Sequence, residues 1–210
     1  MNMYWPLMLG LFLLVNTSIG CRPPAFSQLP VQQDYNVYRA IGFWYTVKWY
    51  ASGSNTAAVP RDDIQLVQLR NDNPKRLLVF GRARDANTKN CFSYGPWLID
   101  ANNGAKLVLQ KRDLSSTTNL NQPFYILQID YEHYALAYTC ATPNYVLNQP
   151  CENRILLLFS RRKVLASKYL RKAERYITKF LCIDLRDLQT NAFRQPSCFP
   201  TDDDSSHSSE

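Results

Sequence analysis

The feature of this chain that most constrains its fold is a series of eight short segments with the composition of β-strands, with no helix predicted between any two of them. Turn sequences separate these segments, and one of them, Ala101-Asn102-Asn103-Gly104, contains the Asn-Gly pair typical of hairpins. The predicted strands are residues 42–51, 64–69, 75–83, 91–100, 105–110, 124–129, 134–140 and 155–160. Consecutive hairpins favour an antiparallel up-and-down meander, and eight such strands avoid exposed edges by closing into a barrel.

A single helix is predicted after the strands. From Ser167, a suitable N-cap, apolar residues recur at helical spacing, namely Tyr169, Leu170, Ala173, Tyr176, Ile177, Phe180 and Leu181. The other face is basic and consists of Lys168, Arg171, Lys172, Arg175 and Lys179. We therefore expect an all-β, eight-stranded antiparallel barrel with one C-terminal α-helix packed outside. A basic amphipathic helix is also typical of an interfacial membrane anchor, and that alternative stays open.

The two ends of the chain differ from its middle. Residues 1–20 contain an apolar segment followed by small residues, which predicts a secretory signal peptide cleaved after Gly20. A lipoprotein signal that leaves Cys21 lipidated is the alternative. Residues 201–210 are acidic and lack apolar side chains, so they are predicted to be a disordered tail. The remaining residues, 21–200, are expected to form one domain that is secreted and extracellular and has no transmembrane segment.

Cysteine usage and charge narrow the class of protein further. All six cysteines follow the signal peptide, so a disulfide framework is expected, although fifteen pairings are possible. Their spacing does not match a zinc site, and we expect neither a metal nor a cofactor. The formal charge is +7 even though the tail is acidic. We expect these charges to be spread over solvated faces, which predicts no nucleic-acid binding and at most a weak interaction with anionic surfaces.

Three stretches carry a resemblance to a known family. They are Gly42-Phe43-Trp44-Tyr45 at the first strand, Asp130-Tyr131-Glu132-His133-Tyr134-Ala135-Leu136 around the turn before the seventh, and Leu157-Leu158-Phe159-Ser160-Arg161 at the end of the eighth. In this order the chain resembles the lipocalins, and among them the group of apolipoprotein D and the insect bilin-binding proteins. The resemblance covers about Cys21 to Cys198.

The resemblance implies a barrel closed at one end by a structural floor. Its residues would be Gly42, Trp44, Asp130, Tyr131 and Arg161. Arg161 is expected to lay its guanidinium on the face of Trp44, in a cation–π contact that leaves its donors free for backbone carbonyls. These residues would hold the floor shut without touching a ligand.

The resemblance also implies a ligand cavity above the floor. If Arg161 faces inward, strand alternation places a set of mostly apolar side chains on the wall. These candidate ligand-binding residues are Ile64, Leu66, Gln68, Leu77, Val79, Leu107, Leu109, Phe124, Ile126, Gln128, Leu157 and Phe159. Such a wall suits a secreted carrier of a small hydrophobic ligand, such as a fatty acid, retinoid, sterol or tetrapyrrole. The oligomeric state is not predicted.

The family suggests disulfide pairs as well. Cys21 and Cys140 match a family bond that ties the N-terminal arm to the end of the seventh strand. A second family bond joins the C-terminal segment to the start of the second strand, where this chain has Asp63 instead of a cysteine. For the other four cysteines, we expect the pairs Cys91–Cys198 and Cys151–Cys182, which the family pattern does not supply.

Two other functions remain as alternatives. The chain lacks Gly-x-Ser-x-Gly and a phosphate loop, and no catalytic residue is predicted. A few lipocalin-fold enzymes use a cavity cysteine, and here only Cys91 would be a candidate for a free thiol. The other alternative is a module that binds a protein or a surface through its basic helix.

Overall fold

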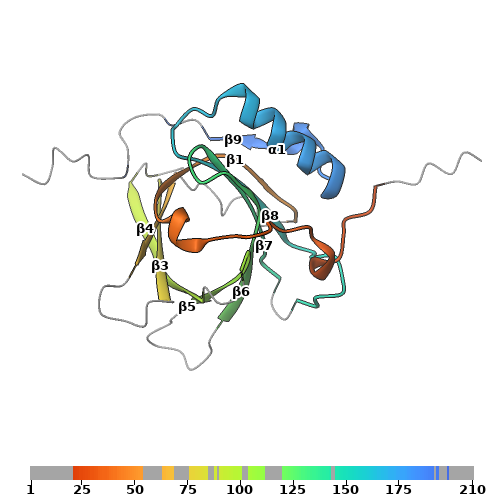
Figure 1. Ribbon diagram of the computed structural model, residues 1–210, viewed down its shortest axis with the longest axis horizontal. Coiled ribbons are helices and arrows are strands. Elements are labelled where there is room, and N and C mark those ends of the chain that lie inside the picture. The colour runs from red at the N-terminus through yellow and green to blue at the C-terminus, as the bar shows by residue number, and fades with distance from the viewer. Residues whose placement is uncertain are drawn as a thin grey trace, which may run out of the picture.

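The computed structural model describes residues 21–53, 63–68, 76–84, 88, 90–100, 104–111, 120–142, 145–191, 193 and 198, some strand residues by their backbone only. The predicted signal peptide and the predicted acidic tail lie outside the described residues. The fold confirms the all-β expectation (Figure 1). Its strands are β1 (Gly42–Ala51), β2 (Asp63–Gln68), β3 (Arg76–Arg84), β4 (Cys91–Asp100), β5 (Lys106–Lys111), β6 (Leu120–Ile129), β7 (Tyr134–Cys140), β8 (Arg154–Ser160) and β9 (Gln189–Thr190).

The strands form one antiparallel sheet that closes on itself. From β2 to β8 each strand pairs with the next along the chain, and β1 completes the ring by pairing with β8 and with β2. The short strand β9 pairs with the second half of β1 and was not predicted. The predicted strand bounds agree with the structure within one or two residues, except that β6 begins four residues earlier, at Leu120.

Bulges interrupt the alternation of side chains in two strands that build the interior. In β1 the register with β8 shifts between Thr46 and Lys48, so Trp44 and Trp49 both belong to the cluster inside the barrel. Lys48 lies on the outer side, where its Nζ donates to Thr190 Oγ1 at 3.2 Å. Simple alternation along residues 42–51 would place Trp44, Thr46, Lys48 and Tyr50 on one face, but it fails beyond Thr46 because an extra residue inverts it.

Strand β7 separates two apolar layers. Its small residues Ala135 and Ala137 belong to the cluster inside the barrel, whereas Tyr134, Leu136 and Tyr138 belong to a second cluster outside it. The outer cluster therefore contains the larger side chains of β7, and β7 contributes only small side chains to the inner wall. This distribution leaves room in the lumen beside β7.

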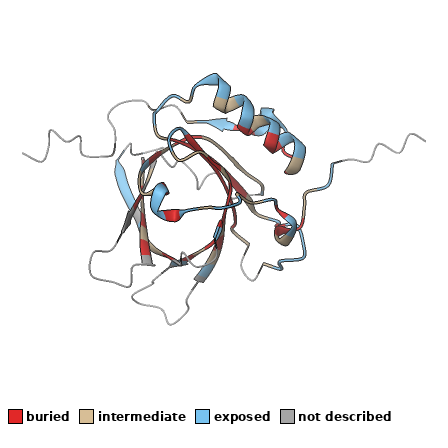
Figure 2. Ribbon diagram, viewed as in Figure 1, coloured by how far each residue is buried: buried red, intermediate tan, exposed pale blue. Residues whose placement is uncertain are grey.

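The helix α1 (Ser167–Phe180) covers the outer cluster, as predicted. Ala173, Tyr176 and Ile177 are its buried residues, and Figure 2 shows its opposite side exposed. Tyr176 also donates a hydrogen bond from its hydroxyl to the carbonyl of Pro30 in the N-terminal arm. Ser167 is the first helical residue and Ala166 the N-cap, so the prediction of Ser167 as N-cap is wrong by one position.

The N-terminal arm runs across one end of the barrel before β1 begins (Figure 1). It contains two short 3₁₀ helices, η1 (Phe26–Gln28) and η2 (Val37–Ala40). Between them, the backbone N–H of Gln32 donates to Ile126 O at 2.9 Å, and its side-chain Oε1 accepts from Ile129 N at 3.2 Å. These two bonds flank the bulge of β6, where the register with β7 shifts between Ile126 and Gln128. The arm thus supplies hydrogen bonds at an interruption of the ladder.

The six cysteines form three disulfides, and two of the expected pairs are wrong. Cys91 pairs with Cys198 as expected, but Cys21 pairs with Cys182 instead of Cys140, with 5.4 Å between the Cα atoms. The bond from Cys21 fastens the start of the arm to the segment just after α1, which packs on the outside of the barrel.

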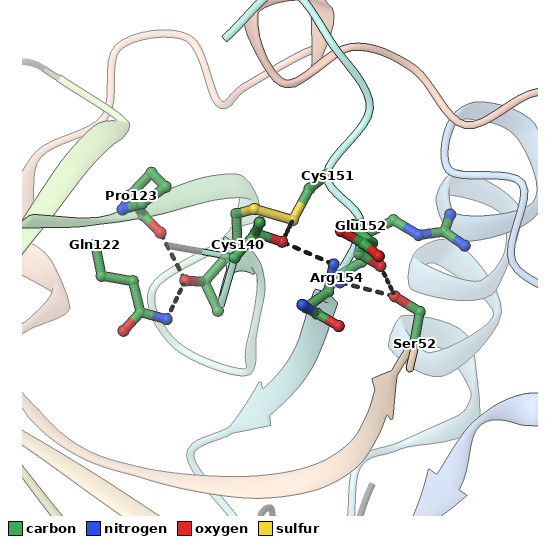
Figure 3. The surroundings of a disulfide bond; sticks show 10 residues. Ser52, Gln122, Pro123, Cys140, Cys151, Glu152 and Arg154 are labelled. Atoms are coloured by element: carbon green, nitrogen blue, oxygen red, sulfur yellow. Dashed lines mark hydrogen bonds between the residues drawn. A yellow bond between two sulfur atoms is a disulfide. The ribbon is translucent and has the colours of Figure 1, made fainter. Parts of the chain in front are cut away.

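Cys140 pairs with Cys151, and the predicted Cys151–Cys182 bond is therefore absent. Cys140 ends β7 and Cys151 precedes β8, so the two strands bring these residues together, with 5.8 Å between their Cα atoms. Figure 3 shows this bond beside Ser52, whose Oγ donates to Glu152 O at 2.7 Å and accepts from Arg154 N at 2.8 Å. The family pairing fails because the adjacent strands β7 and β8 bring Cys140 beside Cys151, while the start of the arm lies beside Cys182.

Candidate functional site

Arg161 and Trp44 close one end of the barrel. The guanidinium carbon lies 3.7 Å from the centre of the indole ring, and Trp44 is almost fully buried. The guanidinium also donates to three backbone carbonyls, to Tyr131 O at 3.0 Å, Phe43 O at 2.9 Å and Arg39 O at 3.3 Å. Trp44 Nε1 donates to Ala40 O at 2.7 Å. The contact predicted from the sequence is therefore present, and burial lowers the pKa of Arg161.

Gly42 and the turn between β6 and β7 complete this floor. Gly42 has a φ of +108°, and a Cβ at this position would lie 3.1 Å from Nη1 of Arg161, so a side chain would strain the backbone and press on the guanidinium. In the turn, Asp130 Oδ1 accepts from His133 N at 2.7 Å and from Tyr134 N at 3.0 Å. Tyr131 adopts a φ of +68° that presents its carbonyl to Arg161. All five predicted floor residues thus meet at one end.

A cavity of about 30 Å³ lies inside the barrel above the floor. Six of the predicted wall residues line it, namely Ile64, Val79, Leu109, Phe124, Leu157 and Phe159. Four others, Leu66, Leu77, Leu107 and Ile126, are buried in the same interior cluster without lining the cavity. The side chain of Gln68 lies outside the described residues.

Gln128 is the predicted wall residue that the structure places elsewhere. The β6 bulge turns it to the outer face, where its Oε1 accepts from Tyr134 Oη at 3.3 Å. Ile129, one position later, belongs to the interior cluster instead. Simple alternation from Phe124 fails here because the bulge adds one residue.

Three cavity residues were not predicted: Trp97, Gln122 and Thr139. Trp97 and Thr139 lie on β4 and β7, strands for which no wall residues were predicted. The small-then-large alternation of β7 was the available signal for Thr139. Gln122 precedes the predicted start of the sixth strand, although it stands two positions before Phe124 and so shares its face.

The polar groups of the wall are gathered on one side. Thr139 Oγ1 donates to Pro123 O at 2.6 Å and accepts from Gln122 Nε2 at 2.9 Å. These two bonds use the hydroxyl hydrogen of Thr139 and one Nε2 hydrogen of Gln122. The carboxamide oxygen of Gln122 is left as an acceptor beside the cavity. Gln122 and Pro123 lie close to the Cys140–Cys151 bond (Figure 3). A buried ligand with one hydroxyl or amine group could therefore be oriented by this corner.

No cysteine of this protein has a free thiol that could act as a nucleophile. All six cysteines are paired, including Cys91, the candidate for a cavity nucleophile. The enzyme alternative that depended on a free Cys91 is therefore wrong as it was framed. No helix among the described residues is long and apolar enough to cross a membrane.

Comparisons with known proteins identify the fold through solved structures. No protein-family model matches the chain, and no curated protein matches it by sequence. Among solved structures it is similar to lobster apocrustacyanin A1, with 18% identity over 77% of this chain and 81% of that chain and a TM-score of 0.56. It is also similar to apocrustacyanin C1 (17% identity, 78% and 82% covered, TM-score 0.57) and apocrustacyanin C2 (18%, 80% and 88%, 0.57).

At this level of identity the comparisons establish the fold. Together with the closed ring of β1 to β8, the outer helix α1 and the Arg161–Trp44 floor, they confirm the expectation raised by the three sequence motifs. The chain has the lipocalin fold.

Proposed function

We propose that this protein is a secreted carrier that binds one small hydrophobic molecule inside its barrel. The observation that carries the proposal is an apolar lumen above a sealed floor, with a cavity on the side where β7 contributes small residues. Burying apolar surface stabilises a bound molecule by about 25 cal/mol for each Å² removed from water. Three disulfides support an oxidising, extracellular location.

The cavity must enlarge to take such a cargo. A volume of about 30 Å³ has room for about one or two water molecules. Trp97, Phe124 and Phe159 are the bulky side chains of its wall, and Phe124 and Phe159 stand on the two strands that flank β7, whose inner residues are small. We infer that rotation of these rings makes room for a fatty acid, retinoid, sterol or tetrapyrrole. The acceptor oxygen of Gln122 would favour a cargo with a hydroxyl or amine at one end.

Native mass spectrometry of the protein secreted from eukaryotic cells tests the proposal directly. The expected result is a 1:1 adduct that is lost on denaturation, or uptake of one equivalent when oleate, retinol, cholesterol or biliverdin is added to empty protein. Leu109→Trp, which fills the cavity, should abolish uptake. Leu185→Trp, at an exposed position on η5 (Leu185–Asp187), is the matched control and should leave it unchanged.

Three outcomes would contradict the proposal. If the wild-type protein takes up none of the four probes, a carrier of these classes is ruled out. If both leucine variants keep full uptake while remaining folded by near-ultraviolet circular dichroism, the molecule binds outside the barrel. A loss of uptake in both variants with retained fold would equally contradict a site at Leu109.

A further inference from the structure

Apolar side chains project into solvent at the closed end of the barrel. Val164 is 81% exposed, Phe43 45% and Tyr38 42%. They come from three separate segments that Arg161 holds together, since its guanidinium donates to the carbonyls of Phe43 and Arg39. Val164 follows Arg161 by three residues on the way to α1. These three apolar side chains therefore share one end of the molecule.

Cations surround these apolar side chains. Arg39, Arg162, Lys163 and Lys168 are all exposed. Among the described residues, the ion pairs are Asp130 with His133 and Asp184 with Arg186, so none of the four cations has a carboxylate partner there. Arg39 and Lys168 lie over the rings of Tyr131 and Tyr169 but remain exposed. We call the seven residues Tyr38, Arg39, Phe43, Arg162, Lys163, Val164 and Lys168 the closed-end face.

Two acidic side chains lie next to this face. Glu132 and Arg162 both line a surface hollow of about 160 Å³, together with His133, Val164 and Tyr169. Asp130 lies in the same turn, where it pairs with His133. Two carboxylates beside four cations leave the face positive. The face therefore complements an anionic partner.

We propose that the closed-end face docks on the surface of a lipid bilayer that contains anionic lipids. Aromatic and aliphatic tips interspersed with Lys and Arg suit the boundary between headgroups and acyl chains, because the rings and Val164 enter it while the cations contact phosphates. A soluble polyanion such as heparin would use the cations but would gain nothing from the exposed Val164. The proposal goes beyond the carrier function, since the floor separates this face from the lumen.

Vesicle co-sedimentation of the full secreted protein tests this inference. Vesicles of phosphatidylcholine with about 30% phosphatidylserine, in about 0.1 M NaCl, should bind the wild-type protein at least tenfold more tightly than vesicles of phosphatidylcholine alone. Val164→Asp should weaken binding by about tenfold or more. Val146→Asp is the matched control, since Val146 is also an exposed valine, 55% exposed, in the segment between β7 and β8, and it should change binding less than about twofold.

A second pair of variants separates the face from overall charge. Each cation near an anionic surface contributes about a fivefold increase in affinity, so Lys163→Glu, which removes one and adds an opposing charge, should weaken binding about twentyfold. Lys179→Glu makes the same change in net charge at the far end of α1 and should have an effect of about twofold or less, because charges that distant are screened.

The opposite results would overturn the proposal. Equal binding to the two kinds of vesicle, or equal losses from Val164→Asp and Val146→Asp, would show that the face does not insert. Equal losses from Lys163→Glu and Lys179→Glu would show attraction to net charge alone. If Val164→Asp leaves both vesicle and heparin binding intact while Lys163→Glu weakens both, the face is a polyanion site and the membrane proposal fails. Thermal unfolding of every variant verifies that it is folded.

Discussion

Thr46 and Thr139 are both buried inside the barrel, with 0% and 1% of their surfaces exposed, yet their hydroxyl groups differ in hydrogen bonding. Thr139 Oγ1 makes two hydrogen bonds, to Pro123 and Gln122. Thr46 Oγ1 has no partner among the described residues. Thr46 stands directly opposite Phe159, a residue of the cavity wall, and the β1 bulge follows it immediately.

This difference predicts opposite effects of the same substitution. Thr46→Val replaces an unpartnered hydroxyl by a methyl group of similar size and should stabilise the fold by about 1 kcal/mol. Thr139→Val should destabilise it by about 2 kcal/mol, because Gln122 and Pro123 lose their partner. Urea unfolding of the two variants measures both effects. A destabilised Thr46→Val protein would show that the hydroxyl has a partner, such as a bound water.

The floor predicts that Arg161 cannot be replaced by another cation. Arg161→Lys keeps a charge over Trp44 but loses the fork that reaches three carbonyls, and it should lower the free energy of unfolding by about 2 kcal/mol. Arg162→Ala is the neighbouring control and should change it by less than about 0.5 kcal/mol. Denaturant titration distinguishes them. A Lys variant as stable as wild type would mean that the cation–π contact alone holds the floor.

The three disulfides predict unequal losses when they are removed singly. Cys21 and Cys182 are 161 residues apart in sequence, whereas Cys140 and Cys151 are 11 apart. By loop entropy, replacing the first pair with alanines should cost about 5 kcal/mol and the second about 3 kcal/mol. Non-reducing peptide mapping establishes the pairing, and denaturant unfolding of the two double variants gives the order. Equal losses would mean that native packing, rather than chain entropy, determines how much each disulfide stabilises the fold.

Buried tyrosines predict a loss of stability in alkali. Burial, and to a lesser extent the charge of Asp130, raises the pKa of Tyr134 from 10.0 to about 12, and burial raises the pKa of Tyr138 and Tyr176 as well. The pKa values of these tyrosines are higher in the folded state than in the unfolded state. Their contribution to the free energy of unfolding is therefore complete below pH 10 and is lost as the pH rises toward 12 and beyond. Unfolding measured from neutral pH upward, with phenolate absorbance, checks this. Tyrosines that all titrate near their ordinary pKa in the folded protein would contradict it.

Strand order and the outer helix could be predicted because they depend on local patterns. Turn residues such as those around Asn103-Gly104 mark the hairpins, and apolar residues at helical spacing mark α1. The floor could be predicted because three motifs converge on it. Each of these signals is carried by residues close together in sequence.

The cavity wall and the disulfides were harder to predict because they depend on a strand bulge and on tertiary contacts, which the pattern of apolar and polar residues does not reveal. One extra residue in β6 moves Gln128 to the outside, and the arm residue Gln32, 97 positions before Ile129 in sequence, supports that bulge. The alternation of apolar and polar residues in β6 does not reveal this bulge. The pairing of Cys21 depends on where the arm lies relative to α1, which is a tertiary relationship. The family pattern gave a wrong partner there.

The bond between Cys21 and Cys182 makes a covalent ring that contains every strand from β1 to β8 as well as α1. A protease that cuts the backbone once inside this ring opens it without releasing a piece. The nicked protein stays one covalent molecule, and under denaturing conditions its two parts separate only when a reductant is added. A chain built in this way can survive a cut loop.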